Sequence, residues 1–198
     1  RYVNEGDRRD VCANAAVNTG FVSTYAIFTE PVVAGYVRPE EIEAGIADGR
    51  ILKADTLDEL AEKINGFEVK GMFPTVTGDN LKATIEKHNG YIDNGEDLDF
   101  HKVMASTMVK IEEGPYYALP QFPSVHHTMG GLVIDTMTRV LDIYGQPIEG
   151  LYAAGEVTGG VHGTNRLGSN ADADACGFGY ISGIVVATGE LPDFIPAE

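Results

Sequence analysis

The densest chemical signal in the sequence is the glycine-rich segment at residues 150–171, which reads GLYAAGEVTGGVHGTNRLGSNA. A buried strand is predicted to run into these glycines, which let a backbone approach a ligand closely. A helix is predicted to open near Asn170, where free amides can bind an anion. Arg166 carries a planar guanidinium suited to a carboxylate. On composition alone, a cofactor site and a glycine-rich loop with a stray arginine are equally good interpretations.

Two other segments carry residues that could do chemistry. The first, at residues 124–131, reads SVHHTMGG and enters a predicted strand. Adjacent histidines in extended backbone point to opposite faces, so His126 and His127 could meet different partners but could not easily chelate one metal. Taken alone, two histidines are more often structural. The second segment, NEGDRRD at residues 4–10, reads by itself as a charged turn before a helix.

Helical and strand signals surround these segments. Thr56 to Glu59 forms a capping box, followed by apolar residues at helical spacing, and Asn94-Gly95 ends another periodic run. These signals predict helices at residues 39–48, 57–65, 79–92 and 171–188, with helix-tolerant residues at 10–18. Strands are predicted at 21–28, 116–119, 132–135, 139–143 and 151–154, with a turn at 144–147. The acidic stretch at 96–102 lacks a calcium-loop pattern, and no metal site is predicted.

Composition limits the classes of partner. The 198 residues carry a formal net charge of −16, which opposes binding to nucleic acid or to anionic membrane surfaces, so an anion site must be local. No apolar run reaches the about 18 to 20 residues that a membrane-spanning helix needs. Cys12 and Cys176 are the only cysteines, which argues against a disulfide framework or a thiolate metal site.

Taken together, the three segments resemble the flavoprotein family of soluble fumarate reductases, which includes flavocytochrome enzymes and urocanate reductases. Succinate dehydrogenase flavoproteins and ketosteroid dehydrogenases are more distant members of the group. The resemblance covers nearly the whole chain and is strongest from His126 to Gly179. It implies an α+β fold, with an inserted capping domain at residues 1–115 and the C-terminal strands and helix of the FAD-binding domain at 116–198.

The resemblance also implies that the chain is a C-terminal fragment. The Gly-x-Gly-x-x-Gly turn that binds the phosphates of FAD is expected upstream of Arg1, in a segment of the same protein. Without that segment, the chain is expected not to hold FAD alone. The implied compartment is the bacterial cytoplasm or an extracytoplasmic space, and the electron donor stays open.

Residue roles follow from matching positions in the family. The implied reaction reduces the C=C bond of an unsaturated carboxylate, such as fumarate or urocanate, by hydride transfer from flavin N5. Arg9 is the implied proton donor, and His126 and Arg166 hold and polarise the carboxylate. The implied cofactor-binding residues are His127, Gly155, Glu156, Gly168, Asn170 and Ala171. Asp172 departs from the family pattern, which often has an apolar residue there, and its charge would disfavour a reduced flavin if it faced inward.

Two other interpretations stay open at this point. The chain could be a non-catalytic fragment or a degenerate homologue without bound FAD, serving structure or interaction. It could also belong to a flavin dehydrogenase that works in the oxidative direction on a steroid or a dicarboxylate.

Overall fold

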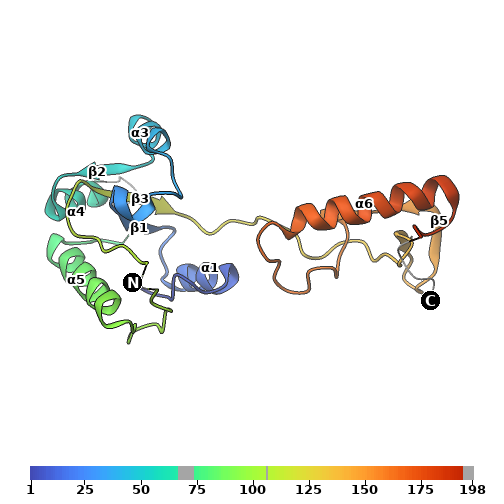
Figure 1. The fold of residues 1–198 in the computed structure, drawn as a ribbon, viewed down its shortest axis with the longest axis horizontal. Helices are drawn as coiled ribbons and strands as arrows, with labels where there is room; N and C mark the ends of the chain where they lie inside the picture. The colour runs from blue at the N-terminus through green and yellow to red at the C-terminus, as the bar shows by residue number, and fades with distance from the viewer. Residues whose placement is uncertain (67–73, 106, 194–198) are drawn as a thin grey trace. The chain divides into compact units, whose positions relative to one another are not determined.

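The computed structural model describes residues 1–66, 74–105 and 107–193. It divides into two compact units, Arg1–Ser124 and Val125–Glu198 (Figure 1). The fold is a mixture of helices and small antiparallel sheets, so the α+β class is confirmed at this level. The first unit extends to Ser124, because strand β3 (Tyr116–Gln121) pairs with strands of that unit.

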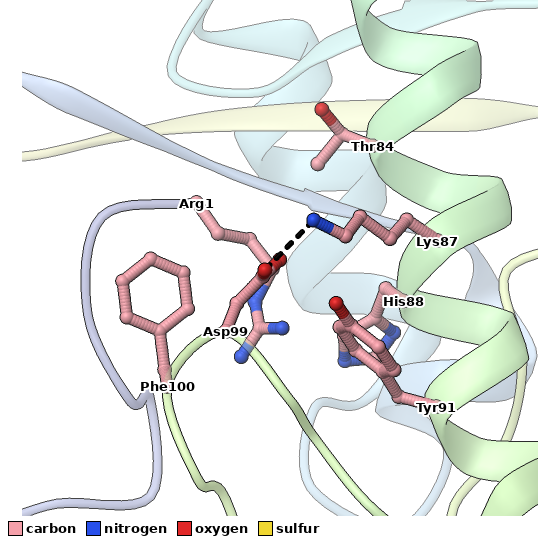
Figure 2. A pocket seen from close by; sticks show the side chains of 7 residues that line it. All are labelled: Arg1, Thr84, Lys87, His88, Tyr91, Asp99 and Phe100. Carbon is pink, nitrogen blue, oxygen red and sulfur yellow. Dashed lines mark hydrogen bonds and ion pairs between the residues drawn. The ribbon is translucent and has the colours of Figure 1, made fainter.

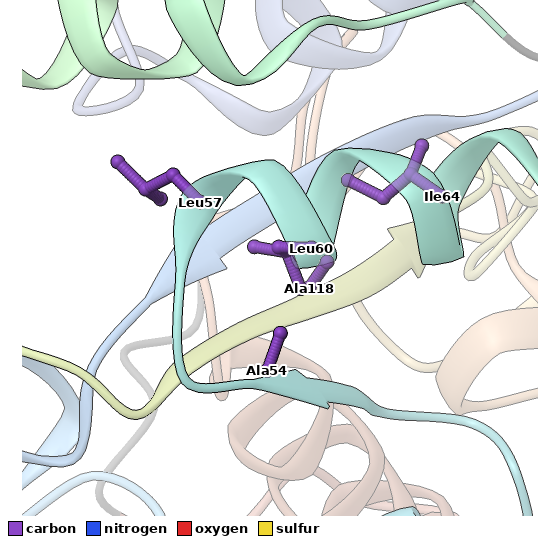
Figure 3. Close-up of a cluster of buried hydrophobic side chains, with 5 residues drawn as sticks. All are labelled: Ala54, Leu57, Leu60, Ile64 and Ala118. Atoms are coloured by element: carbon purple, nitrogen blue, oxygen red, sulfur yellow. The ribbon is translucent and has the colours of Figure 1, made fainter.

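The first unit is built on a three-stranded antiparallel sheet in the order β1-β3-β2. Strand β1 (Thr24–Phe28) pairs with one edge of β3, and β2 (Leu52–Ala54) pairs with the other. Helix α4 (Leu57–Asn65) lies across one face of this sheet, as Figure 3 shows. The core cluster there consists of Ala54, Leu57, Leu60, Ile64 and Ala118. The apolar spacing seen in the sequence is therefore the buried face of the helix.

Four further helices lie in the described residues of the first unit. They are α1 (Arg9–Asn18), α2 (Glu30–Val33), α3 (Pro39–Ala47) and α5 (Gly78–Asn94). The predictions for α1, α3, α4 and α5 are confirmed within one or two residues at most ends, whereas α2 was not predicted. Strand β1 begins at Thr24, three residues later than predicted.

The helix caps in this unit follow from local chemistry. The Thr56 hydroxyl accepts a hydrogen bond from the Glu59 amide at 3.2 Å, as the capping pattern predicts. The Glu59 carboxylate, however, accepts from the Asp55 amide and not from Thr56, so the box is shifted by one residue. Helix α5 ends at Gly95, whose φ of 73° is readily accessible to glycine.

The second unit contains strands β4 (Arg139–Leu141) and β5 (Pro147–Tyr152), the short 3₁₀ helix η1 (Gly155–Val157) and helix α6 (Asn170–Thr188). β4 and β5 pair antiparallel around a turn in which Asp142 accepts from two amides. The strand predicted at 132–135 is wrong, because that segment makes only isolated bridges, Leu132 with Thr158 and Ile134 with Val140. No helix in the described part of the chain is long and apolar enough to cross a membrane.

Candidate functional site

Two glycine-rich segments of the second unit lie backbone to backbone. The Leu132 amide donates to the Val157 carbonyl at 2.8 Å, and the Gly159 amide donates to the Leu132 carbonyl at 3.0 Å. A methyl group on Gly131 would overlap the Val157 carbonyl oxygen, and one on Gly159 would lie 2.6 Å from the Gly131 nitrogen. The sequence analysis predicted that glycines of residues 150–171 let the backbone approach a ligand. At positions 131 and 159 the close neighbour is protein backbone.

The histidine pair is anchored through the residue that follows it. The Thr128 amide donates to Glu156 Oε1 at 3.1 Å, and the Thr128 hydroxyl donates to the Glu156 carbonyl at 3.2 Å. His126 is exposed, whereas His127 is half-buried and its Nδ1 accepts from the Met129 amide at 3.1 Å. The two rings therefore have different surroundings, as expected for neighbours in extended backbone. Thr128, which follows His127 in the chain, therefore joins this segment to Glu156.

A second cluster joins His127 to two residues that sequence reasoning missed. The His127 and His162 rings meet edge to face, with centroids 5.2 Å apart. His162 Nε2 lies 3.0 Å from the Oδ2 of Asp174, which is buried on α6. One ligating atom from each of the three residues lies within 4.8 Å of the other two. An acidic residue inside a helix otherwise rich in alanine, glycine and apolar residues was the available signal for Asp174.

Arg166 is buried, with 8% of its surface exposed. Its Nη1 donates to the Leu167 carbonyl at 3.0 Å, and its Nε is buried without a hydrogen-bond partner among the described residues. No carboxylate of the described residues forms an ion pair with it. Because arginine stays protonated in proteins, this is a buried cation that its own unit does not neutralise.

The beginning of α6 has no side-chain cap, although the Asn170 amide donates to the Leu167 carbonyl at 3.3 Å. Ser169 is the residue before the helix, it has φ of 67°, and its side chain makes no capping hydrogen bond. Gly168 and Asn170 are exposed and Ala171 is half-buried. Uncapped amides at a helix N-terminus can bind an anion or a carbonyl oxygen. The ligand-binding role of residues 168–171 stays a prediction.

Two residues near this turn have a different setting. Gly155, with φ of 78°, is buried, and a methyl group on it would lie 3.4 Å from the Cβ of Ala175 on α6. Its described contacts therefore serve packing of η1 against α6. Asp172 is exposed.

Arg9 is the first residue of α1, and its side chain is exposed. It belongs to the first unit, whereas the other predicted site residues belong to the second. Asp10, the nearest acidic neighbour in the sequence, pairs with Arg8 at 2.9 Å. Arg9 itself takes part in no ion pair within the described residues.

A pocket in the first unit contains none of the predicted site residues. The cavity has a volume of about 390 Å³. Figure 2 shows the side chains that line it, which are those of Arg1, Thr84, Lys87, His88, Tyr91, Asp99 and Phe100. Lys87 and Asp99 form an ion pair across it at 2.7 Å. Burial, together with the charges of Lys102 and Arg1, lowers the pKa of His88, which keeps that ring neutral. We assign this pocket no role in the candidate site.

Comparison with known proteins identifies relatives along nearly the whole chain. It is 45% identical over 185 residues to an NADH:acrylate oxidoreductase of Vibrio harveyi, covering 92% of this chain and 17% of the relative. It is 39% identical over 183 residues to a fumarate reductase (cytochrome) of Shewanella frigidimarina, covering 92% of this chain and 29% of the relative. The chain thus spans less than a third of the curated relatives it matches.

A solved structure gives the same result. The open conformation of a flavocytochrome c3 fumarate reductase matches 92% of this chain and 30% of its own, with a TM-score of 0.65 and 35% sequence identity. A family model described as the FAD binding domain matches residues 1–171, which is more than half of the chain. The resemblance found in the sequence is therefore confirmed, and the chain belongs to the FAD binding domain family of fumarate reductase-like flavoproteins.

Proposed function

We propose that the chain forms part of an FAD-dependent oxidoreductase that reduces the C=C bond of an unsaturated carboxylate. The first unit would serve as the capping domain and the second as the C-terminal part of the FAD-binding domain. The relatives named above act, by their names, on acrylate and fumarate, which are both unsaturated carboxylates. The segment that binds the FAD phosphates would be an upstream part of the same protein.

The observation that carries the proposal is the pairing of the arginines. The chain has seven, and five form ion pairs with carboxylates in the described residues, namely Arg1, Arg8, Arg38, Arg50 and Arg139. Within the same residues the two others, Arg9 and Arg166, form none. They are the two arginines to which the resemblance gives catalytic roles.

The burial of Arg166 makes its lack of a partner informative. An unpaired cation out of water costs several kcal/mol, so it persists where an anion binds it for part of the working cycle. A guanidinium can bind a carboxylate through two parallel hydrogen bonds, which fixes both its position and its orientation. A substrate carboxylate would satisfy Arg166 and its free Nε.

The roles of the chain's own residues follow. Arg166 and His126 would bind the substrate carboxylate and stabilise the carbanion-like charge that develops beside it. Arg9 would donate a proton to one alkene carbon, and bound reduced flavin would supply the hydride to the other. Together the hydride and the proton reduce the double bond. Arg9 must then recover its proton, and Asp7 and Asp10 are its nearest acidic neighbours in the sequence.

The second unit has groups that fit a flavin. The positive end of the α6 dipole, at the turn formed by Gly168, Asn170 and Ala171, would stabilise negative charge on the reduced ring. His127 has a buried Nε2 without a partner among the described residues, and it is available to the same ligand. Glu156 would bind the ribityl or ribose part, and Gly155 would hold η1 against α6 beside it.

The test compares two arginine variants of the full-length protein. Arg166→Ala is expected to lower turnover of fumarate, acrylate or urocanate by about 10²- to 10³-fold, as for loss of other charge-stabilising groups, with flavin content nearly unchanged. Arg50→Ala is the matched control, because Arg50 lies on the surface in a pair with Asp48 and should leave turnover unchanged. Full activity in Arg166→Ala would refute the carboxylate assignment.

One similar solved structure is a reason to test also whether the protein is a dehydrogenase that works in the oxidative direction. A 3-ketosteroid Δ1-dehydrogenase of Sterolibacterium denitrificans matches 96% of the chain with a TM-score of 0.69 at 25% identity. The same preparations should therefore be assayed with a ketosteroid and an electron acceptor. Turnover of the steroid without reduction of any acid would replace our proposal, and a full-length product without flavin would favour the non-catalytic interpretation.

A further inference from the structure

Asp174 is a buried carboxylate on a helix that offers it no local partner. Its side chain is 2% exposed, and the segment of α6 around it reads ADADACGFG. Its Oδ2 meets His162, whereas its Oδ1 is buried without a hydrogen-bond partner among the described residues. A buried carboxylate is expected to be fully hydrogen-bonded, so the half-satisfied Asp174 indicates a second donor close by.

His162 is fixed by this carboxylate. Its side chain is 10% exposed, and its Nε2 lies 3.0 Å from Asp174 Oδ2. An ionised carboxylate can only accept hydrogen bonds, so His162 Nε2 must carry the hydrogen and donate it. This fixes the tautomer and the orientation of the ring.

His127 is fixed from its other nitrogen. Its Nδ1 accepts the Met129 amide hydrogen at 3.1 Å, so in the neutral ring the hydrogen is on Nε2. That Nε2 is buried and has no partner among the described residues. One nitrogen of each ring and one Asp174 oxygen lie within 4.8 Å of one another, a separation that a small side-chain shift or one bridging water spans. His127, which has an unsatisfied donor, and Asp174, which has an unsatisfied acceptor, thus belong to the same cluster.

The same three side chains could be considered for a metal ion, but the hydrogen bonds argue against it. A metal ligand needs a lone pair directed at the ion. In His127 one nitrogen uses its lone pair for the Met129 amide, and the other carries the hydrogen. Metal binding would therefore require His127 to give up its backbone hydrogen bond.

We propose that Asp174 is a positioning residue whose carboxylate accepts hydrogen bonds from His162 and His127 and holds both rings as the Nε2–H tautomer. The assignment rests on the proposed function, because the segment it fixes carries His126 and His127, the residues proposed to bind the substrate and the flavin. Asn170 and Asp174 are four residues apart on α6 and share a helix face, so one helix would orient both the flavin-side turn and the histidine segment.

The direct test is the tautomer state in the 198-residue chain, which needs neither flavin nor activity. Imidazole ¹⁵N chemical shifts should show the Nε2–H form for His127 and His162 in the wild type. In Asp174→Asn, the His162 signals should move and its single tautomer should be lost. Asp172→Asn, an exposed change in the first turn of the same helix, is the matched control and should leave both rings unaltered.

Several outcomes would overturn the proposal. An Nδ1–H form of either ring in the wild-type chain would do so, and this reading does not depend on whether any variant folds. Stoichiometric binding of Zn²⁺ by the wild type, lost in Asp174→Asn, would replace the positioning role with a metal site. In the full-length flavoenzyme, kcat is expected to fall about tenfold or more in Asp174→Asn, by analogy with carboxylates that orient ligating histidines in metal sites. If kcat did not fall in Asp174→Asn although both rings had the expected tautomer, the result would count against the proposed function alone.

Discussion

Gly131→Ala adds a single methyl group and is expected to destabilise the second unit. A methyl group there would overlap the Val157 carbonyl oxygen and lie 2.8 Å from the Val157 carbonyl carbon and 2.9 Å from that of Thr158. All three are backbone atoms, which cannot rotate away. Gly130, the preceding residue, offers a matched control because a methyl group on it would lie 4.0 Å from its nearest neighbour, the Thr128 oxygen.

The magnitude follows from the contacts that must open. Carbon atoms pack at about 3.5–4.0 Å, so Gly131→Ala must push the two segments apart by about 1 Å. The hydrogen bonds Leu132 N–Val157 O and Gly159 N–Leu132 O, now 2.8 and 3.0 Å, would then be broken. Each hydrogen bond contributes about 0.5–1.5 kcal/mol to the stability of the folded state. Alanine also restricts the unfolded chain more than glycine does, which offsets the loss by about 0.4–1 kcal/mol. We expect a net loss of about 1–2 kcal/mol.

The assay is urea denaturation of the 198-residue chain combined with amide hydrogen exchange. Because the chain has two compact units, exchange at the Leu132 and Gly159 amides reports on the second unit specifically. These amides should exchange about 5- to 30-fold faster in Gly131→Ala and at an unchanged rate or slower in Gly130→Ala. Equal rates in the two variants would show that the segments do not pack as described.

Three further predictions concern the first unit. Leu60→Ala, in the fully buried core, should lower the free energy of unfolding by about 2–5 kcal/mol, against less than about 0.5 kcal/mol for the exposed Leu98→Ala, both measured by urea denaturation. The hydrogen bond from Arg1 holds the pKa of the buried Asp97 well below its usual range. Its stabilisation should therefore be complete above about pH 4 and be lost as the pH falls further, and Asp97→Asn should remove this part of the acid dependence of the urea midpoint. Burial and a hydrogen bond to a carboxylate raise the pKa of Tyr117 to about 12. Stability should then fall between about pH 10 and about pH 12, and Tyr117→Phe should reduce that loss in the same denaturation series.

The parts of the fold that could be predicted are those whose causes lie close together in the sequence. Helix α4 was predicted with both ends correct, because its cap at Thr56 and its apolar face at Leu57, Leu60 and Ile64 lie within nine residues. The expected strand at 132–135 failed for the opposite reason. Leu132 finds its partners at Val157 and Thr158, and that distant segment supplies bridges rather than a ladder.

The candidate site divides in the same way. His126, His127, Glu156 and Arg166 could be named because they stand in ordered motifs, and Glu156 is tied to the histidine segment through Thr128. His162 and Asp174 could not be named from the sequence, because their roles depend on contacts among three segments. From the sequence Asp174 is expected to be a solvated residue of the helix, whereas in the structure it is buried and its Oδ2 lies 3.0 Å from His162 Nε2.

The two unpaired arginines are separated from carboxylates by different local causes. The chain has thirty acidic residues, so an arginine on its surface has many possible partners. Arg9 follows Arg8, and it is Arg8 that pairs with the carboxylate of Asp10, at 2.9 Å. Arg166 is separated from carboxylates by burial, and its Nε has no hydrogen-bond partner among the described residues. An acidic chain that needs cations for an anionic substrate must protect them from its own carboxylates, and these two arrangements are the local means by which this sequence could do so.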